Sequence, residues 1–166
     1  MISYKKSQVI LKKSKIKIGE EQINTNNCLN RVTASNIYVK TNYPLGNNAA
    51  FDGYAIKSSE TKKINKKIHK KFRIVGSIAA GNKPLKKNFK KFQTIEIMTG
   101  ALLPKNFDTI VPIEQIKFHP NDKKPRYILL NEKISKFKHV RFKGSDFKKN
   151  DLLSSQGTII QSNHIL

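Results

Sequence analysis

The sequence has no tryptophan and only one cysteine, Cys28, among its 166 residues. A single cysteine excludes an internal disulfide and a Cys-X-X-Cys metal or redox motif. The four histidines stand far apart, without metal-ligand spacing. No apolar run approaches the roughly 20 residues that span a bilayer, and the first residues lack the apolar region and cleavage site of a secretory signal. We therefore expect a reducing, cytoplasmic environment and no membrane association.

Acidic residues and arginines are also scarce. The chain has 33 basic and 11 acidic residues, a formal charge of +22, and only four arginines. A strong positive charge is typical of nucleic-acid-binding proteins, but base readout and bidentate phosphate contacts favour arginine over lysine. The excess of Lys, Asn and Ile, the residues of A/T-rich codons, favours a solvated lysine surface over a nucleic-acid site. A genuine polyanion site is the alternative.

The chain is long enough for one ordinary domain or two very small ones. Its core should be small, since hydrophobic residues make up 37% of it. Residues 3–13 are predicted to form a basic helix that Ser3 caps. Residues 20–29 are predicted to form a second short helix, with acidic side chains in its first turn. Residues 31–39 favour an extended conformation because β-forming side chains are frequent there.

Hydrophobic residues alternate from Phe72 onward, which is typical of strands. The alternation places Phe72, Ile74, Gly76 and Ile78 on one face, and Pro112 implies an edge strand or a bulge. Strands are predicted at residues 72–78, 92–99, 109–116, 126–130 and 137–142. Short strands at this spacing predict an antiparallel sheet or small barrel.

Three further segments complete the prediction. Residues 61–71 are lysine-rich and are predicted to be an exposed connection. Residues 157–160 are predicted to be extended. Residues 162–166 are predicted to be the capped start of a helix, which suggests that further chain follows.

The segment Phe51-Asp52-Gly53-Tyr54-Ala55 is the first candidate for chemistry. Asp52 is one of few acids in a basic chain, and its carboxylate could hold a cation or a ligand hydroxyl. An ordinary Asp-Gly turn, with the carboxylate bonded to local amides, is the competing interpretation.

Two other segments have similar potential. In Ile97-Met98-Thr99-Gly100-Ala101 a strand ends in a Thr-Gly pair, which leaves a hydroxyl and backbone N–H groups for an anion. In the turn 141–146, Arg141 and Asp146 flank Gly144, an arrangement that suits an oxyanion together with a metal. Each segment alone is equally compatible with an ordinary turn.

The order of these segments is more specific than any one of them. Together with Val111-Pro112-Ile113-Glu114, the series resembles the molybdopterin molybdotransferases, the bacterial molybdenum-inserting enzymes related to the E domain of gephyrin. The resemblance extends over nearly the whole chain. It implies an α+β, mainly β fold with short N-terminal helices, extended linker segments and an inserted small antiparallel β-barrel-like domain.

The resemblance also implies a domain organisation. Residues 1–42 would form an N-terminal helical and extended segment, residues 43–138 the small β domain, and residues 139–166 a return segment that completes the elongated N-terminal region. The α/β domain and C-terminal β domain that follow in the family are absent from this chain. Family members act as homodimers, with the active site between the β domain of one subunit and the α/β domain of the other.

The implied reaction is insertion of molybdate into adenylylated molybdopterin with loss of AMP, assisted by Mg²⁺. The resemblance assigns catalytic roles to Asp52, Thr99 and Asp146, with Asp52 and Asp146 also as metal ligands. It assigns substrate binding to three residues: Gly53, Gly100 and Arg141. Where the family usually has Asp, Ser and Met, this chain has less polar residues at three positions: Asn47, Ala49 and Phe51.

We expect the chain alone to be inactive, because most of the pterin pocket belongs to the missing α/β domain. Two alternatives stay open. The chain could be a non-catalytic basic binding module derived from the family, or a dimerisation arm that positions a separate α/β subunit.

Overall fold

The computed structural model describes residues 1–14, 18–65, 67–83, 85 and 88–165. Within these residues the chain has one α-helix, α1 (Tyr4–Lys13), and is otherwise strands, turns and 3-10 helices, as the predicted fold class requires. It forms two compact units, Met1–Tyr38 with Leu152–Leu166, and Val39–Asp151. The predicted domain boundaries at residues 42 and 138 stay a prediction.

The strands are short. In chain order they are β1 (Ile37–Tyr38), β2 (Asn48–Ala49), β3 (Gly53–Ile56), β4 (Lys70–Ile78), β5 (Gln93–Ile97), β6 (Thr109–Pro112), β7 (Lys117–His119), β8 (Tyr127–Leu130), β9 (Val140–Arg141) and β10 (Leu152–Ser154). The 3-10 helices are η1 (Thr25–Asn27), η2 (Ser58–Thr61), η3 (Ile113–Gln115) and η4 (Ser162–His164).

The predicted N-terminal helix is confirmed, and the second helix is wrong. The Ser3 side chain accepts a hydrogen bond from the Lys6 amide at the start of α1, and no residue of α1 is buried. Residues 20–29 contain only η1, where the Asn24 side chain accepts from the Asn26 amide at 3.0 Å. Asparagine side chains compete in this way with helical hydrogen bonds, which outweighs the favourable acidic first turn.

The smaller unit is held by pairing between its two distant chain segments. β1 and β10 are antiparallel, and Val32 forms an isolated bridge with Ile159. Thr33 is buried, and its hydroxyl donates to the Ser155 carbonyl at 2.7 Å. The predicted extended segment 157–160 takes part in this pairing through the bridge at Ile159. Of the predicted C-terminal helix start, η4 is formed, and Leu166 lies outside the described residues.

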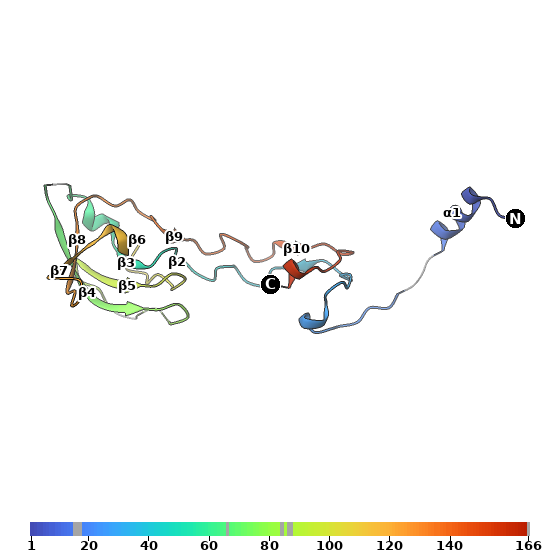
Figure 1. The fold of residues 1–166 in the computed structure, drawn as a ribbon, viewed down its shortest axis with the longest axis horizontal. Coiled ribbons are helices and arrows are strands. Elements are labelled where there is room, and N and C mark those ends of the chain that lie inside the picture. The colour runs from blue at the N-terminus through green and yellow to red at the C-terminus, as the bar shows by residue number, and fades with distance from the viewer. Residues whose placement is uncertain (15–17, 66, 84, 86–87, 166) are drawn as a thin grey trace. The chain divides into compact units, whose positions relative to one another are not determined.

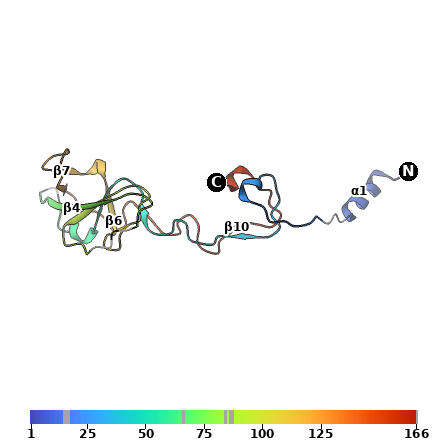
Figure 2. The same cartoon turned by 90° about the horizontal axis from the view of Figure 1, so that it is seen from below.

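The larger unit is built on a six-stranded sheet of order β6-β3-β5-β4-β8-β7. Figures 1 and 2 show these strands gathered in one curved layer. All neighbouring strands are antiparallel except β4 and β5, which are parallel and so depart from the predicted pairing. β6 lies at the sheet edge, where Pro112 predicted an edge strand, because proline cannot donate to a further neighbour.

Both faces of the sheet are packed, each with its own hydrophobic cluster. Ile95 and Ile97 belong to one cluster, and Phe72 and Ile128 to the other. β4 contributes to both, because its register with β5 shifts between Ile74 and Ser77. The predicted single face of Phe72, Ile74, Gly76 and Ile78 is therefore wrong: an irregularity in a strand reverses the alternation of side chains beyond it, and Ile78 packs in the cluster opposite Phe72.

Strand boundaries differ from the prediction in identifiable places. β6 ends at Pro112 and is followed by η3, and the predicted strand 137–142 reduces to β9, which pairs with β2 outside the six-stranded sheet. β4 begins at Lys70, inside the predicted connection 61–71, whose Lys66 lies outside the described residues. In the described part of the chain, no helix has the length and apolar character needed to cross a membrane.

Candidate functional site

The sheet topology brings Asp52 and Thr99 together, although 47 residues separate them. β3 and β5 are antiparallel neighbours, with Gly53 opposite Ile97. The residue before β3 therefore meets the residues just after β5. Asp52 and Thr99 are both exposed at this end of the sheet.

Two hydrogen bonds fix the Asp52 carboxylate. Its Oδ1 accepts one from the Thr99 amide and one from the Thr99 hydroxyl, each at 2.6 Å. The hydroxyl bond, followed by the amide bond, lowers the pKa of Asp52 below its ordinary value. No donor among the described residues is hydrogen-bonded to Oδ2. The Asp52 carboxylate is therefore ionised, with Oδ1 hydrogen-bonded to Thr99 and Oδ2 available to a ligand.

Two glycines permit this geometry for different reasons. A Cβ on Gly53 would stand 2.1 Å from the Val111 carbonyl oxygen, so only glycine allows β3 and β6 to approach. Gly53 is buried within the sheet, whereas Gly100 is exposed, has φ +80° and donates its amide to the Ala49 carbonyl at 2.8 Å. This left-handed conformation turns the chain directly after Thr99.

Arg141 and Asp146 bind each other. The Arg141 guanidinium forms an ion pair with Asp146 Oδ2, and the Ser145 hydroxyl donates to Oδ1 at 2.9 Å. The hydrogen bond from Arg141, followed by that from Ser145, holds the pKa of Asp146 below its ordinary value. The turn is anchored because the Gly144 amide donates to Pro44 and the Asp146 amide to Tyr43.

β2 connects these two clusters. Its Asn48 pairs with Arg141 in β9, while Ala49 accepts from the Gly100 amide and donates to the Ala101 carbonyl. The Asp52–Thr99 pair and the Arg141–Asp146 pair are therefore both attached to one short strand.

A divalent cation fits Asp52 better than it fits Asp146. Asp52 is exposed with Oδ2 available, whereas both Asp146 oxygens already accept hydrogen bonds. The described residues include no cluster of three or more His, Cys, Asp or Glu side chains arranged to hold a metal. Magnesium often keeps several waters and binds through one or two carboxylates plus substrate phosphates. The Asp52 carboxylate could therefore be the only ligand that this chain provides to such an ion.

Sequence reasoning missed His139, which stands alone in the sequence. Its ring meets Phe51 edge-on at 4.9 Å, and burial, followed by the charge of Lys138, lowers its pKa. Its Nε2 and the Asn48 Oδ1 are buried without a hydrogen-bond partner among the described residues. Phe51 therefore contributes an apolar contact beside Asp52.

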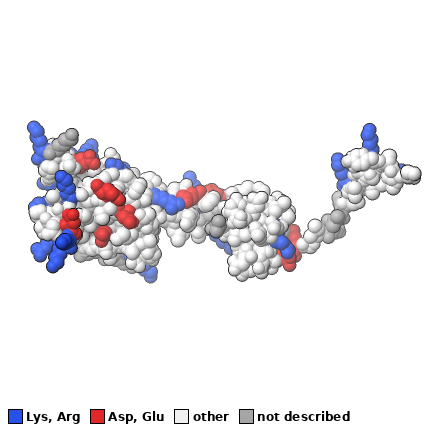
Figure 3. Space-filling model, viewed as in Figure 1, with Lys and Arg blue, Asp and Glu red and all other residues white. Residues whose placement is uncertain are grey.

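The positive charge is not gathered into one band on the face drawn in Figure 3. Basic side chains are spread along the edges of the larger unit there, with acidic side chains between them. Nucleic-acid sites usually show a continuous basic patch or stripe, so this face resembles a solvated lysine surface.

A sequence family described as the MoeA N-terminal region (domain I and II) matches residues 2–166. The chain belongs to this family. The Asp52, Thr99, Arg141 and Asp146 segments all lie within the matched MoeA N-terminal region.

Curated relatives carry the name molybdopterin molybdenumtransferase. The protein from Haemophilus influenzae is 28% identical over 82% of this chain and 31% of its own length. That from Bacillus subtilis is 28% identical over 86% of this chain and 33% of its own. That from Staphylococcus epidermidis is 25% identical over 97% of this chain and 37% of its own. This MoeA N-terminal region thus spans about a third of the curated relatives it matches.

Solved structures support the same fold. One crystal structure of a molybdopterin biosynthesis MoeA protein from Pyrococcus horikoshii has a TM-score of 0.82 and 27% identity, covering 97% of this chain and 40% of that one. A second structure from that organism has a TM-score of 0.79 and 23% identity, covering 87% and 37%.

Proposed function

We propose that this chain is the N-terminal portion of a molybdopterin molybdotransferase and supplies one side of the site at which molybdate enters adenylylated molybdopterin, with release of AMP. The observation that carries the proposal is the Asp52–Thr99 pair. Two donors from one residue hold an exposed carboxylate ionised at the tip of the sheet. Membership of the MoeA N-terminal region and the names of the relatives give the chemical context.

In this proposal Asp52 contributes negative charge at a fixed position. Its Oδ2 would hold Mg²⁺, which supplies charge neutralisation at the substrate phosphates when bound. Thr99 is a positioning residue, since both of its bonds go to the opposite oxygen. Gly53 and Gly100 act through the backbone. Gly53 allows β3 to approach β6, and Gly100 allows the turn after Thr99.

Arg141 is proposed to bind an anionic group of the substrate. One guanidinium nitrogen is engaged by Asp146, and a guanidinium has five N–H donors in all. Asp146 orients Arg141 for that contact and is not proposed as a metal ligand, because Arg141 and Ser145 occupy its oxygens. This is a narrower role than the resemblance implied for Asp146.

The proposed site is completed by a partner. An α/β domain outside residues 1–166, carried by another chain of the assembly, would supply the pterin pocket opposite Asp52. Because the chain spans about a third of its relatives, the proposal predicts that residues 1–166 alone do not insert molybdenum.

A chimera tests this function directly. The corresponding N-terminal stretch of the Bacillus subtilis relative would be replaced by this chain, and molybdenum insertion would be measured with molybdate, Mg²⁺ and adenylylated molybdopterin. We expect insertion by the chimera and none by the isolated chain. A chimera that melts cooperatively and dimerises as the parent does, but inserts no molybdenum, would instead support a non-catalytic binding module.

A further inference from the structure

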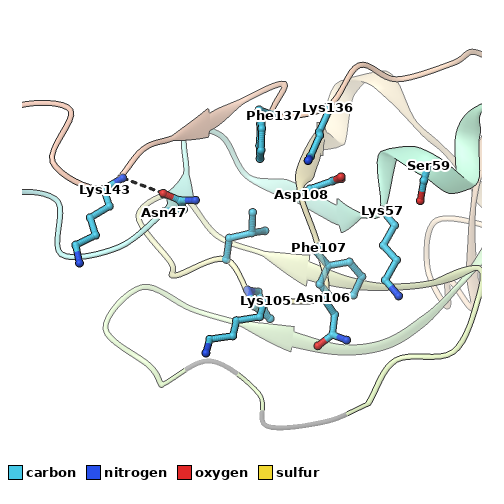
Figure 4. A pocket seen from close by; sticks show the side chains of 12 residues that line it. Asn47, Lys57, Ser59, Lys105, Asn106, Phe107, Asp108, Lys136, Phe137 and Lys143 are labelled. Carbon is cyan, nitrogen blue, oxygen red and sulfur yellow. Dashed lines mark hydrogen bonds between the residues drawn. The ribbon is translucent and has the colours of Figure 1, made fainter.

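A groove of about 680 Å³ lies in the larger unit, lined by neither Asp52 nor Asp146. Four lysines line it and arrive from separate parts of the chain: Lys57, Lys105, Lys136 and Lys143. Figure 4 shows these side chains around the groove, together with Asn47, Asn106 and Ser59 as neutral polar groups. Pockets of roughly 300–1,000 Å³ are the size range of small-molecule sites.

The frame of the groove is hydrogen-bonded. Asn47 joins two walls, since its side-chain oxygen accepts from the Lys143 amide and its carbonyl accepts from the Leu103 amide, both at 2.9 Å. Phe107 is buried against Phe89, with ring centroids 4.6 Å apart. These contacts fix the backbone at Lys143 and the wall of the groove around Phe107.

The lysine charges are not balanced within the groove. Asp108 is its one acidic lining residue, and both of its carboxylate oxygens accept from Ser58, from the amide at 2.7 Å and from the hydroxyl at 2.9 Å. Among the described residues, the ion pairs are Arg31–Glu21 and Arg141–Asp146, so none involves the groove. Lys136 Nζ lies 4.6 Å from the centre of the Phe137 ring, which also lines the groove. The groove therefore carries excess positive charge, which a bound anion would offset.

We propose that this groove binds a small phosphorylated ligand through its four lysines. Ammonium groups are effective point-charge partners of phosphate, and the neutral amides and hydroxyl can donate to further phosphate oxygens. The four lysines come from separate segments of the chain, and the lining of the groove has one acidic side chain for four basic ones. The shared chemistry is a diphosphate, from either inorganic pyrophosphate or a nucleoside diphosphate.

Titration calorimetry and thermal melting of the 166-residue chain test the proposal, with sodium pyrophosphate and ADP as probes and sodium chloride at matched ionic strength as control. We expect saturable binding of at least one probe and a rise in Tm. Tighter binding of ADP would identify a nucleotide source, and tighter binding of pyrophosphate an inorganic one.

Paired variants separate a site from general charge. Lys57→Gln with Lys105→Gln should weaken binding about tenfold or more, since each substitution removes a charged partner of the phosphate oxygens. The same variant should melt no lower than the parent without ligand, because neither ammonium group forms a hydrogen bond or an ion pair among the described residues. Lys62→Gln with Lys133→Gln removes the same charge from exposed positions outside the groove, and binding should stay within about twofold.

Equal weakening by both variants, or no saturable binding of either probe, would overturn the proposal. So would binding of a single-stranded RNA alone with both probes inert. If the groove variant does not fold, NMR shift changes at the Ser59, Asn106 and Phe107 amides on adding pyrophosphate to the unmodified chain decide the question: shifts at these amides support the site, and shifts spread over the surface contradict it. Because no molybdate is present, the result is independent of the proposed insertion activity.

Discussion

Replacing Gly53 by alanine should strongly destabilise the larger unit. The added Cβ would lie 2.1 Å from the Val111 oxygen and 2.9 Å from Pro112 Cα, all backbone atoms that cannot rotate away. Because Cβ atoms essentially never come within 3.0 Å of such atoms, β6 would have to move by about 1 Å. Overpacking of this kind costs about 1–3 kcal/mol. Weakening the four-residue pairing of β3 with β6 adds about 1 kcal/mol for each hydrogen bond lost.

We therefore expect a loss of about 3 kcal/mol or more, seen as a fall in Tm of about 10 °C. Gly76→Ala is the matched control within the same sheet, because its Cβ would meet side-chain atoms alone, Leu85 Cδ1 at 3.3 Å and Ile95 Cγ2 at 3.9 Å. It should cost less than about 1.5 kcal/mol. Circular dichroism melting measures both. A Gly53→Ala protein that melts within about 2 °C of the parent would refute the close-approach argument.

Three further predictions follow from single contacts. Thr99→Val should raise the pKa of Asp52 toward its ordinary value, while Thr99→Ser should preserve the lowered pKa. NMR titration of the Asp52 carboxyl carbon measures both, and the same Asp52 pKa in the two variants would contradict the role of the hydroxyl. Phe72→Ala, at a fully buried site, should cost about 3–5 kcal/mol in chemical unfolding, whereas Phe142→Ala, on the surface, should cost less than about 1 kcal/mol. Burial, followed by the charge of Glu96, raises the pKa of Tyr54 to about 12. Because the folded state favours the neutral phenol, Tyr54 contributes to the free energy of unfolding fully below about pH 10, and this contribution is lost as the pH rises toward 12. Tyr54→Phe should remove that alkaline loss of stability, and an unchanged alkaline melting profile would contradict it.

The sequence predicted the elements that have clear local signals. Ser3 marks the start of α1, the alternation around Ile95 and Ile97 marks β5, and Pro112 marks an edge strand. β3 was missed because Asp52-Gly53 is also a typical turn pair, and the reason for the glycine lies in β6, far along the chain. The parallel pairing of β4 with β5 depends on chain connectivity, which alternation of side chains does not encode.

The roles of the candidate site residues stay a prediction, but the structure shows contacts between them that the sequence does not encode. The resemblance singled out Asp52, Thr99, Arg141 and Asp146, and the structure joins them as two separate pairs on either side of β2. Nothing in the local sequence indicates that Arg141 and Ser145 occupy both Asp146 oxygens. The lysine groove had no sequence signal, because lysines are frequent everywhere and only folding brings these four together.

The most direct test of the account is molybdenum insertion by the Bacillus subtilis chimera carrying Asp52→Asn. This substitution keeps the shape of the side chain and removes the charge that Thr99 stabilises. We expect the rate to fall by about a hundredfold or more, with Tm lowered by no more than about 5 °C, while Asp122→Asn, at an exposed acid in a surface turn, leaves the rate intact. Insertion by the Asp52→Asn chimera at the parent rate would contradict the central claim that this carboxylate acts in the reaction.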